Sequence, residues 1–256
     1  MIELVGIHKG FGRQQVLKGV NLTIARGQIT AIIGRSGGGK SVLLKHLVGL
    51  IRPDRGQVLV GGDDIGQLRG KALDQVREKF GVLFQGGALF DSMTVFDNVA
   101  FPLREKTRMG ESEIAERVGQ RLEAVGLADM GHKFPAEISG GMKKRAALAR
   151  ALVQDPEIIL FDEPTTGLDP ILLNSIHRLI LDAHKRFGFT AVVVSHEIPE
   201  IFDIAQEVAM LHDGVIAEHG SPELIMSSAN PIVRQFITGA ADGPIRPASE
   251  LPSRSR

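Results

Sequence analysis

A glycine-rich loop near the start of the chain has the residue types and the spacing of a phosphate-binding site. It matches the pattern G-x-x-x-x-G-K-[ST] and reads Gly34, Arg35, Ser36, Gly37, Gly38, Gly39, Lys40 and Ser41. Glycines let backbone N–H groups wrap a phosphate chain, and a helix that starts at the loop adds partial positive charge. Lys40 would reach the terminal phosphates, and Ser41 could ligate Mg²⁺. The alternative is a glycine-rich turn before a helix, and the motif alone does not separate kinases, GTPases and ATP-driven machines.

Three more polar side chains follow apolar runs that are typical of buried strands. Asp162 and Glu163 come after residues 158–161, and His196 comes shortly after residues 191–194. In an open parallel sheet, ligands bind outside the carboxyl ends of the strands, so these side chains should converge with the glycine loop. Asp162 would hold Mg²⁺, Glu163 could orient a hydrolytic water and His196 could contact a γ-phosphate. Taken alone, Glu163 is better explained as an exposed acid and His196 as a structural residue.

The apolar pattern alternates between strands and helices along most of the chain. Strands are expected at residues 2–7, 16–24, 29–33, 57–60, 80–84, 158–161 and 191–194. Helical spacing follows the glycine loop and recurs at Ile114, Val118, Leu122 and Val125, and over residues 142–153 and 171–183. The alternation predicts an α/β fold with a mostly parallel sheet and a helical insertion near residues 87–155.

Composition excludes several classes of protein. The 256 residues are 43% apolar, too apolar for wholesale disorder. The 30 Lys and Arg balance the 30 Asp and Glu, so no overall basic field attracts nucleic acid, which is not an expected partner. Without Cys, disulfides, thiolate catalysis and iron–sulfur ligation are excluded. No stretch is apolar enough to span a bilayer and no signal peptide is present, which predicts a cytosolic chain that can dock to another protein.

The stretch from residue 138 to residue 152 carries a resemblance to a known family. It reads Ile-Ser-Gly-Gly-Met and then a basic, alanine-rich segment, which is similar to the L-S-G-G-Q signature of the ATP-binding cassette (ABC) ATPases. Gln85 stands at the position of the family's Q-loop, Asp169 at its D-loop and His196 at its switch histidine. The order of glycine loop, signature, Asp-Glu pair and histidine is that of the family, and the resemblance extends from residue 2 to about residue 226.

This resemblance implies a P-loop fold with a RecA-like parallel-sheet core, an antiparallel β subdomain and an α-helical subdomain. It implies one nucleotide-binding domain over residues 1–238. The catalytic core would occupy residues 1–86 and 156–226, and the helical subdomain with the signature would occupy residues 87–155. A flexible C-terminal extension would follow at residues 239–256.

The resemblance also implies roles for particular residues. The family closes two cassettes head to tail around ATP, so each ATP would bridge two copies of the chain. The implied ATP-binding residues are Phe11, stacked on adenine, the loop 34–41, Ser139, Gly140, Gly141 and Asp169. The implied catalytic residues are Glu163, His196 and Gln85, and the implied Mg²⁺ ligands are Ser41, Gln85 and Asp162.

Two positions depart from the family pattern. Met142 replaces the usual Gln of the signature, and Thr166 and Gly167 stand where many relatives have Ser and Ala before the Leu-Asp of the D-loop. Neither change removes a catalytic group, so the chain is predicted to be an active ATPase.

A narrower resemblance appears at residues 82–90 and 93–105 and in several later stretches. These are similar to the ATPase subunits of Mla-type phospholipid transporters, also called the Mkl or organic-solvent-resistance group. The resemblance implies a peripheral protein on the cytoplasmic side of the inner membrane, driving phospholipid between inner and outer membranes and so maintaining outer-membrane lipid asymmetry. Its partners would be a second copy of itself, an integral membrane permease dimer, an MCE-domain lipid-binding protein and, in some members, a STAS-domain subunit.

Glycine pairs, Phe84 and Leu89 would form an apolar surface near the Q-loop, where the family docks its permease. The alternative is generic packing between lobes. Other functional classes are the ATPase of a small polar nutrient importer, a soluble non-transport cassette protein and a P-loop nucleotide kinase. Residues 240–256, which contain Pro244, Pro247 and Pro252, have the composition of a segment that orders only on contact. The resemblance to Mla-type ATPases implies that this segment reaches across to the second ATPase subunit.

Overall fold

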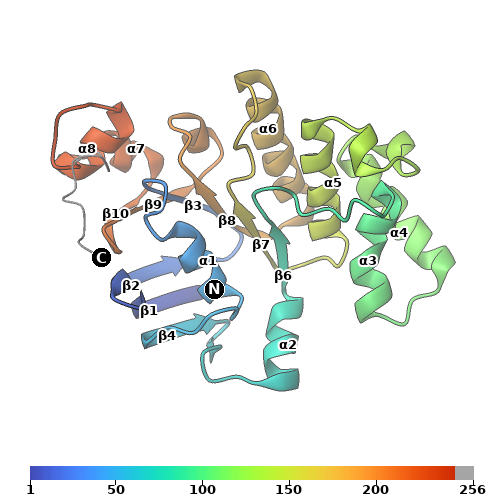
Figure 1. Cartoon of the computed structure of the whole chain (residues 1–256), viewed down its shortest axis with the longest axis horizontal. Coiled ribbons are helices and arrows are strands. Elements are labelled where there is room, and N and C mark those ends of the chain that lie inside the picture. Colours follow the sequence, from blue (N-terminus) through green and yellow to red (C-terminus); the bar gives the residue numbers. More distant parts are fainter. Residues whose placement is uncertain (246–256) are drawn as a thin grey trace.

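The computed structural model of the chain describes residues 1–245, which form two sheets and the helices around them (Figure 1). The larger sheet has six strands in the order β10-β9-β3-β8-β7-β6. Its strands are β3 (Ile29–Ile33), β6 (Phe80–Leu83), β7 (Ile158–Asp162), β8 (Thr190–Ser195), β9 (Glu207–His212) and β10 (Val215–Gly220). Neighbours pair in parallel except β10, which runs antiparallel to β9. The expected parallel core is therefore confirmed.

The central strands β3, β7 and β8 are mostly apolar and almost entirely buried because both faces of the sheet are covered. Along β3, Ala31 packs into one hydrophobic cluster and Ile32 into another, and along β8 Val193 and Val192 divide in the same way. The first cluster is shared with helices on one side, and the second with the smaller sheet on the other. Successive strand residues point to opposite faces, so a strand buried on both sides shows a continuous apolar run rather than alternation.

The smaller sheet has the order β2-β1-β4-β5 and is antiparallel. It consists of β1 (Ile2–Phe11), β2 (Gln14–Ile24), β4 (Arg55–Val60) and β5 (Asp63–Asp64). Residues of β1 and β2 alternate between buried and exposed over much of their length, since one face packs inward. Helix α1 (Lys40–Leu47) leaves the glycine loop and packs in the same core, and α2 (Gly70–Glu78) connects this part to β6.

The helical insertion consists of α3 (Val95–Lys106), α4 (Glu111–Ala124) and α5 (Gly140–Leu152), with short 3₁₀ turns η1 (Ala128–Met130) and η2 (Pro135–Glu137). These helices lie together at one side of the molecule, away from α1 (Figure 1). Thr94 caps α3 by accepting a hydrogen bond from the Asp97 N–H at 3.0 Å. The insertion falls within the range that the sequence pattern predicts.

The chain returns through α6 (Pro170–Phe187), η3 (Glu200–Asp203), α7 (Pro222–Met226) and α8 (Pro231–Thr238). None of the helices within residues 1–245 is long and apolar enough to cross a bilayer.

Residues 239–245, the start of the segment expected to be flexible, fold back onto α8. The Gln235 amide donates to the carbonyl oxygens of Ala240 at 3.2 Å and Ile245 at 3.1 Å, and its oxygen accepts from the Ile245 N–H at 2.6 Å. The rest of that expected extension, residues 246–256, lies outside the described residues.

Candidate active site

The glycine loop joins β3 to α1 in the setting that the motif requires. Gly34 has a φ of 150°, and a Cβ there would lie 2.3 Å from the carbonyl oxygen of Leu211 on β9. Gly39, at the start of α1, has a φ of 100°, and a Cβ there would lie 3.0 Å from the Val16 side chain. Larger residues at either position would force the backbone to move, so both glycines are needed for the shape of the loop.

Lys40 turns its ammonium group into this loop. Its side chain is only 4% exposed, and its Nζ donates to the carbonyl oxygens of Gly34 at 2.8 Å and Arg35 at 3.0 Å. Glu163 Oε1 lies 3.9 Å away. Burial lowers the pKa of Lys40, and the carboxylates of Glu163 and Asp162 partly oppose that shift. A buried cation held by carbonyl oxygens is placed to exchange them for phosphate oxygens.

Ser41 and Asp162 meet at the first turn of α1 and the end of β7. The Ser41 hydroxyl donates to Asp162 Oδ1 at 3.0 Å. Burial raises the pKa of the Asp162 carboxyl, the Ser41 hydrogen bond opposes this and the neighbouring Glu163 adds to it. A hydroxyl and a carboxylate are hard oxygen ligands of the kind that Mg²⁺ takes. Within residues 1–245, no group of three or more His, Asp or Glu side chains could hold a metal by itself, so phosphate oxygens and water would have to complete the shell.

Glu163 is mostly buried and hydrogen-bonded, so it is not the exposed surface acid that its sequence position alone would suggest. Its side chain is 14% exposed, and its Oε2 accepts from Gln85 Nε2 at 3.2 Å and from the Thr166 hydroxyl at 3.1 Å. His196 Nδ1 lies 3.4 Å from Oε1. The backbone of Glu163 adopts a left-handed φ of 50°, which is strained for a residue with a side chain, and its N–H donates to Val194 O at 3.0 Å.

The structure therefore brings together the side chains that the sequence pattern placed at three strand ends. We call the group Lys40, Ser41, Gln85, Asp162, Glu163 and His196 the catalytic cluster. Thr166, noted in the sequence only as a departure from the family pattern, also belongs to its surroundings because of its hydrogen bond to Glu163. Lys144 was missed, and its Nζ donates a hydrogen bond to the Gln85 carbonyl oxygen.

The signature residues lie elsewhere in the chain. Ser139 caps α5 by accepting from the Met142 N–H at 3.3 Å, and the ideal Cβ position at Gly140 has no neighbour within 4 Å. Asp169 caps α6 and accepts from the N–H groups of Ile171 at 3.0 Å and Leu172 at 3.1 Å. Helix α5 stands apart from α1 in Figure 1, so one chain does not place its signature on its own glycine loop. Ile171, beside Asp169, is 81% exposed.

Phe11 and the remaining loop residues are the other positions expected to bind ATP. Phe11, at the end of β1, is 50% exposed and lies under the Lys9 ammonium group at 5.5 Å, so it is not a buried strand-end residue. Gly38 donates its N–H to Arg35 O at 3.1 Å, and Gly37 has a φ of 73° with open space where a Cβ would stand. Ser36 and Gly37 are the two central residues of the turn that this hydrogen bond closes.

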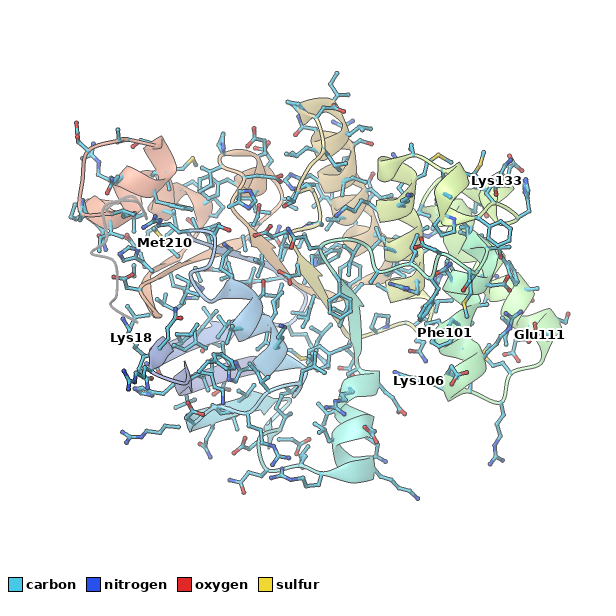
Figure 2. The ribbon with its side chains drawn as sticks, viewed as in Figure 1. Lys18, Phe101, Lys106, Glu111, Lys133 and Met210 are labelled. Atoms are coloured by element: carbon cyan, nitrogen blue, oxygen red, sulfur yellow. The ribbon has the colours of Figure 1, made fainter. Side chains whose placement is uncertain are left out.

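An apolar groove lies between the parallel sheet and the helical insertion, and its lining includes Phe80, Phe84, Phe90, Phe101, Pro102 and Arg150. Its volume is about 440 Å³. The Phe90 and Phe101 rings pack with centroids 5.0 Å apart, and Phe101 and Lys106 lie on α3 in Figure 2. Leu89, expected on this surface, is half-buried and packs against the main core.

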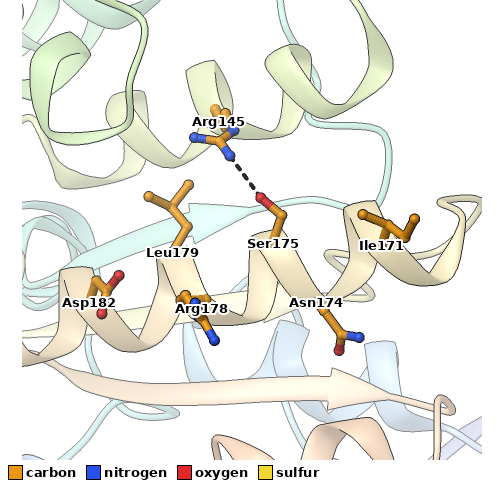
Figure 3. Close-up of a pocket in the computed structure, with 7 residues that line it drawn as sticks. All are labelled: Arg145, Ile171, Asn174, Ser175, Arg178, Leu179 and Asp182. Carbon is orange, nitrogen blue, oxygen red and sulfur yellow. Dashed lines mark hydrogen bonds between the residues drawn. The ribbon is translucent and has the colours of Figure 1, made fainter.

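A second hollow of about 400 Å³ is lined by Arg145 of α5 and by residues of α6 (Figure 3). There the Arg145 guanidinium of α5 donates to the Ser175 hydroxyl of α6 at 2.8 Å. This contact ties the signature helix to the helix that follows the D-loop.

Known proteins are similar to this chain over most of its length. A model of the ABC transporter family matches residues 17–166. The probable ribonucleotide transport ATP-binding protein mkl of Mycobacterium tuberculosis is 46% identical over 249 residues, which cover 97% of this chain and 69% of the relative. The intermembrane phospholipid transport system ATP-binding protein MlaF of Escherichia coli K12 is 45% identical over 234 residues. The aligned part is 91% of this chain and 87% of the MlaF chain. MlaF of Haemophilus influenzae is 42% identical over 96% of this chain and 93% of its own length.

Solved structures show the same fold. A dimeric ATP-binding cassette in a post-hydrolysis state, bound to ADP and Pi, has a TM-score of 0.78 and 32% identity, covering 87% of this chain and 99% of its own. The cbiO1 protein of Clostridium perfringens, part of an ABC transporter complex, has a TM-score of 0.82 and 30% identity, covering 91% and 93%. The chain belongs to the ABC transporter family and is an ATPase cassette of that family.

Proposed function

We propose that this ATPase drives phospholipid transport between the inner and outer membranes of a Gram-negative envelope. The catalytic cluster is the observation that carries hydrolysis, because it joins a phosphate-binding lysine, a Ser–Asp pair fit for Mg²⁺ and a fixed carboxylate. The MlaF relatives, named for intermembrane phospholipid transport, support the cargo.

The names of the relatives disagree about cargo, since the mycobacterial relatives are called probable ribonucleotide transporters. Two relatives named for intermembrane phospholipid transport, the MlaF proteins, are 45% and 42% identical to this chain. We choose phospholipid because residues 82–90 and 93–105 resemble the ATPase subunits of Mla-type phospholipid transporters.

Within the cluster, each residue has a proposed role. Lys40 and the loop residues 34–39 bind the ATP phosphates, while Ser41, Asp162 and the Gln85 amide hold Mg²⁺, which when bound neutralises phosphate charge. Glu163 orients the attacking water, and His196 contacts the γ-phosphate. Phe11, half exposed, stacks on adenine.

A second copy completes each site in this proposal. Ser139, Gly140 and Gly141 start a helix whose N–H groups can bind an anion, yet they stand away from the loop of their own chain. The cassette solved with ADP and Pi is dimeric. Two copies arranged head to tail would place the signature and Asp169 of one against the ATP held by the other.

The membrane partner is a permease dimer that docks in the apolar groove, with an MCE-domain protein and a STAS-domain subunit as further components. Exposed aromatic rings such as Phe84 and Phe90 support docking there, because apolar surface of this kind is covered in a working assembly. The ATPase would then sit peripherally on the cytoplasmic side of the inner membrane.

Purification from membranes tests this function. The chain, expressed with its native neighbours, should co-purify with a permease that carries phospholipid, and ATP should drive lipid transfer between donor and acceptor vesicles. The Glu163→Gln complex is the control and should assemble without transferring lipid. Stimulation by ribonucleotides without lipid transfer would favour the other cargo, and a purely soluble ATPase would contradict a transport role.

A further inference from the structure

Two cations of α5 hold the backbone of the Q-loop segment, residues 85–88. The Lys144 ammonium group donates to the carbonyl oxygen of Gln85. The Arg150 guanidinium donates to the carbonyl oxygens of Gly87 at 2.6 Å and Ala88 at 2.7 Å. Three of the four carbonyl groups in this short segment therefore bond to the signature helix.

The segment needs such support because its backbone is strained. Gly87 has a φ of 77° and Ala88 a φ of 48°, so two consecutive residues adopt the left-handed region, and Ala88 does so with a side chain. Strained backbone persists where surrounding contacts determine it. The Arg150 bonds act at these two residues.

Lys144 is a buried lysine whose ammonium group loses solvation by water and bonds instead to the Gln85 carbonyl oxygen. Its residue is 8% exposed, and burial lowers the pKa of its ammonium group, while the carboxylates of Glu197 and Glu163 oppose that shift. A lysine on a basic helix ordinarily extends into water. Here it turns inward toward the loop that carries Gln85.

The two cations link distant parts of the cassette. Arg150 lines the apolar groove, whereas the Gln85 side chain donates to Glu163 at 3.2 Å. Lys144 and Arg150 are six residues apart on α5, a distance of about 9 Å along the helix, so together they contact both ends of the Q-loop segment.

We propose that Lys144 is a positioning residue for hydrolysis, which fixes the Gln85 backbone so that the Gln85 amide meets Glu163. Arg150 holds the other end of the same segment against α5. A shift of α5 then carries the Q-loop segment with it and changes the placement of Gln85 at the catalytic carboxylate. This inference rests on the proposed roles of Gln85 and Glu163 in ATP hydrolysis.

The experiment measures ATP hydrolysis by the full chain across an ATP concentration series. In Lys144→Met, kcat should fall about tenfold to a hundredfold while KM changes less than about threefold, because displacement of a positioned group costs rate rather than binding. Lys144→Arg, which keeps a charged donor, should recover most of the rate. Lys71 is an exposed lysine on α2, and the matched control Lys71→Met should leave kcat unchanged.

A double-mutant cycle separates positioning from general damage to the fold. If Lys144 acts through Gln85, adding Lys144→Met to Gln85→Ala should cost less than about threefold further rate. Independent, multiplying losses would overturn the proposal, as would a Lys144→Met variant that hydrolyses ATP at the normal rate. A wild-type chain without ATPase activity would instead contradict the proposed function itself.

Discussion

Glu163 is the residue on which the assignment of hydrolysis depends most directly. Glu163→Gln keeps the size of the side chain and removes the negative charge that would orient the attacking water. Hydrolysis should fall by about 10² to 10⁴-fold, while ATP still binds, so an ATP-bound dimer accumulates. Phosphate release and light scattering after gel filtration measure the two effects. Lys40→Ala is the contrasting variant and should weaken ATP binding itself, whereas normal turnover in Glu163→Gln would refute the role of Glu163.

Asp162 illustrates the conflict between stability and binding in this site. Burial raises the pKa of Asp162, so the folded chain binds a proton at this carboxyl more tightly than the unfolded chain does. Protonation therefore stabilises the fold fully below the ordinary pKa of 3.8, and this contribution is lost as the pH rises through the raised pKa of the folded chain. At neutral pH its charge therefore destabilises the nucleotide-free chain.

Asp162→Asn removes that charge and keeps an oxygen that can accept the Ser41 hydrogen bond. At pH 7.5 the thermal midpoint without nucleotide should rise by about 1 to 3 °C, and ATP hydrolysis should fall sharply. The gain should shrink at pH 4.5, where the native carboxyl is more often protonated. The exposed Asp129→Asn serves as the control, and a lowered midpoint at pH 7.5 would contradict this account.

Most residues of the catalytic cluster are predictable from sequence because each stands at a strand end or in a spaced motif. Lys144 and Arg150 are not, because a basic, alanine-rich helix has the pattern of a solvated face. Their role depends on the loop that packs beside the helix, which is about sixty residues away in the chain. Family spacing marks Gln85, but nothing in the local sequence indicates which side chains fix its backbone.

At the scale of elements, the N-terminus of α5 should matter for dimer formation more than for folding. Ser139→Ala removes a cap whose bond to Met142 N–H is long, at 3.3 Å, so stability should fall by no more than about 1 kcal/mol. In the proposed dimer the same hydroxyl contacts the partner's ATP, so ATP-dependent dimerisation should be strongly reduced.

Ser221 provides a matched control for this prediction. It caps α7 with a bond to Leu224 N–H at the same 3.3 Å, in a helix that carries no motif. Ser221→Ala should therefore change stability by a similar amount and leave the ATP-dependent dimer intact. Equal effects of the two substitutions on dimerisation would show that Ser139 is only a cap.

The long or doubly buried elements follow from the sequence, and the short surface elements do not. β3, β7 and β8 are mostly apolar because they are covered on both faces, and α6 shows a clear apolar stripe. α2 buries only Leu73 and Val76, which is too weak a pattern to predict. α8 is followed by a folded-back segment that bonds to the side chain of Gln235, and such an arrangement leaves no periodic signal.

At the scale of the whole molecule, the two halves of the proposed active site belong to different copies. The catalytic cluster surrounds the glycine loop, whereas the signature helix lies on the helical side of the molecule (Figure 1). A closed head-to-tail pair would contain two sites, each with Lys40 from one chain and Ser139 from the other.

This arrangement predicts complementation between two inactive variants. In a mixed dimer of Lys40→Ala and Ser139→Ala chains, one site carries both defects, while the other combines an intact loop with an intact signature. Equal mixing should therefore restore about a quarter of wild-type activity if chains pair at random and sites act independently. The control is a chain that carries both substitutions, mixed with wild type, because its mixed dimers have two defective sites. Mixed dimers isolated through two different tags should hydrolyse ATP at about half the wild-type rate in the first mixture and not at all in the control. No recovery in the first mixture, with mixed dimers detected by differently tagged chains, would mean that each chain completes its own site or that the two sites cannot act separately.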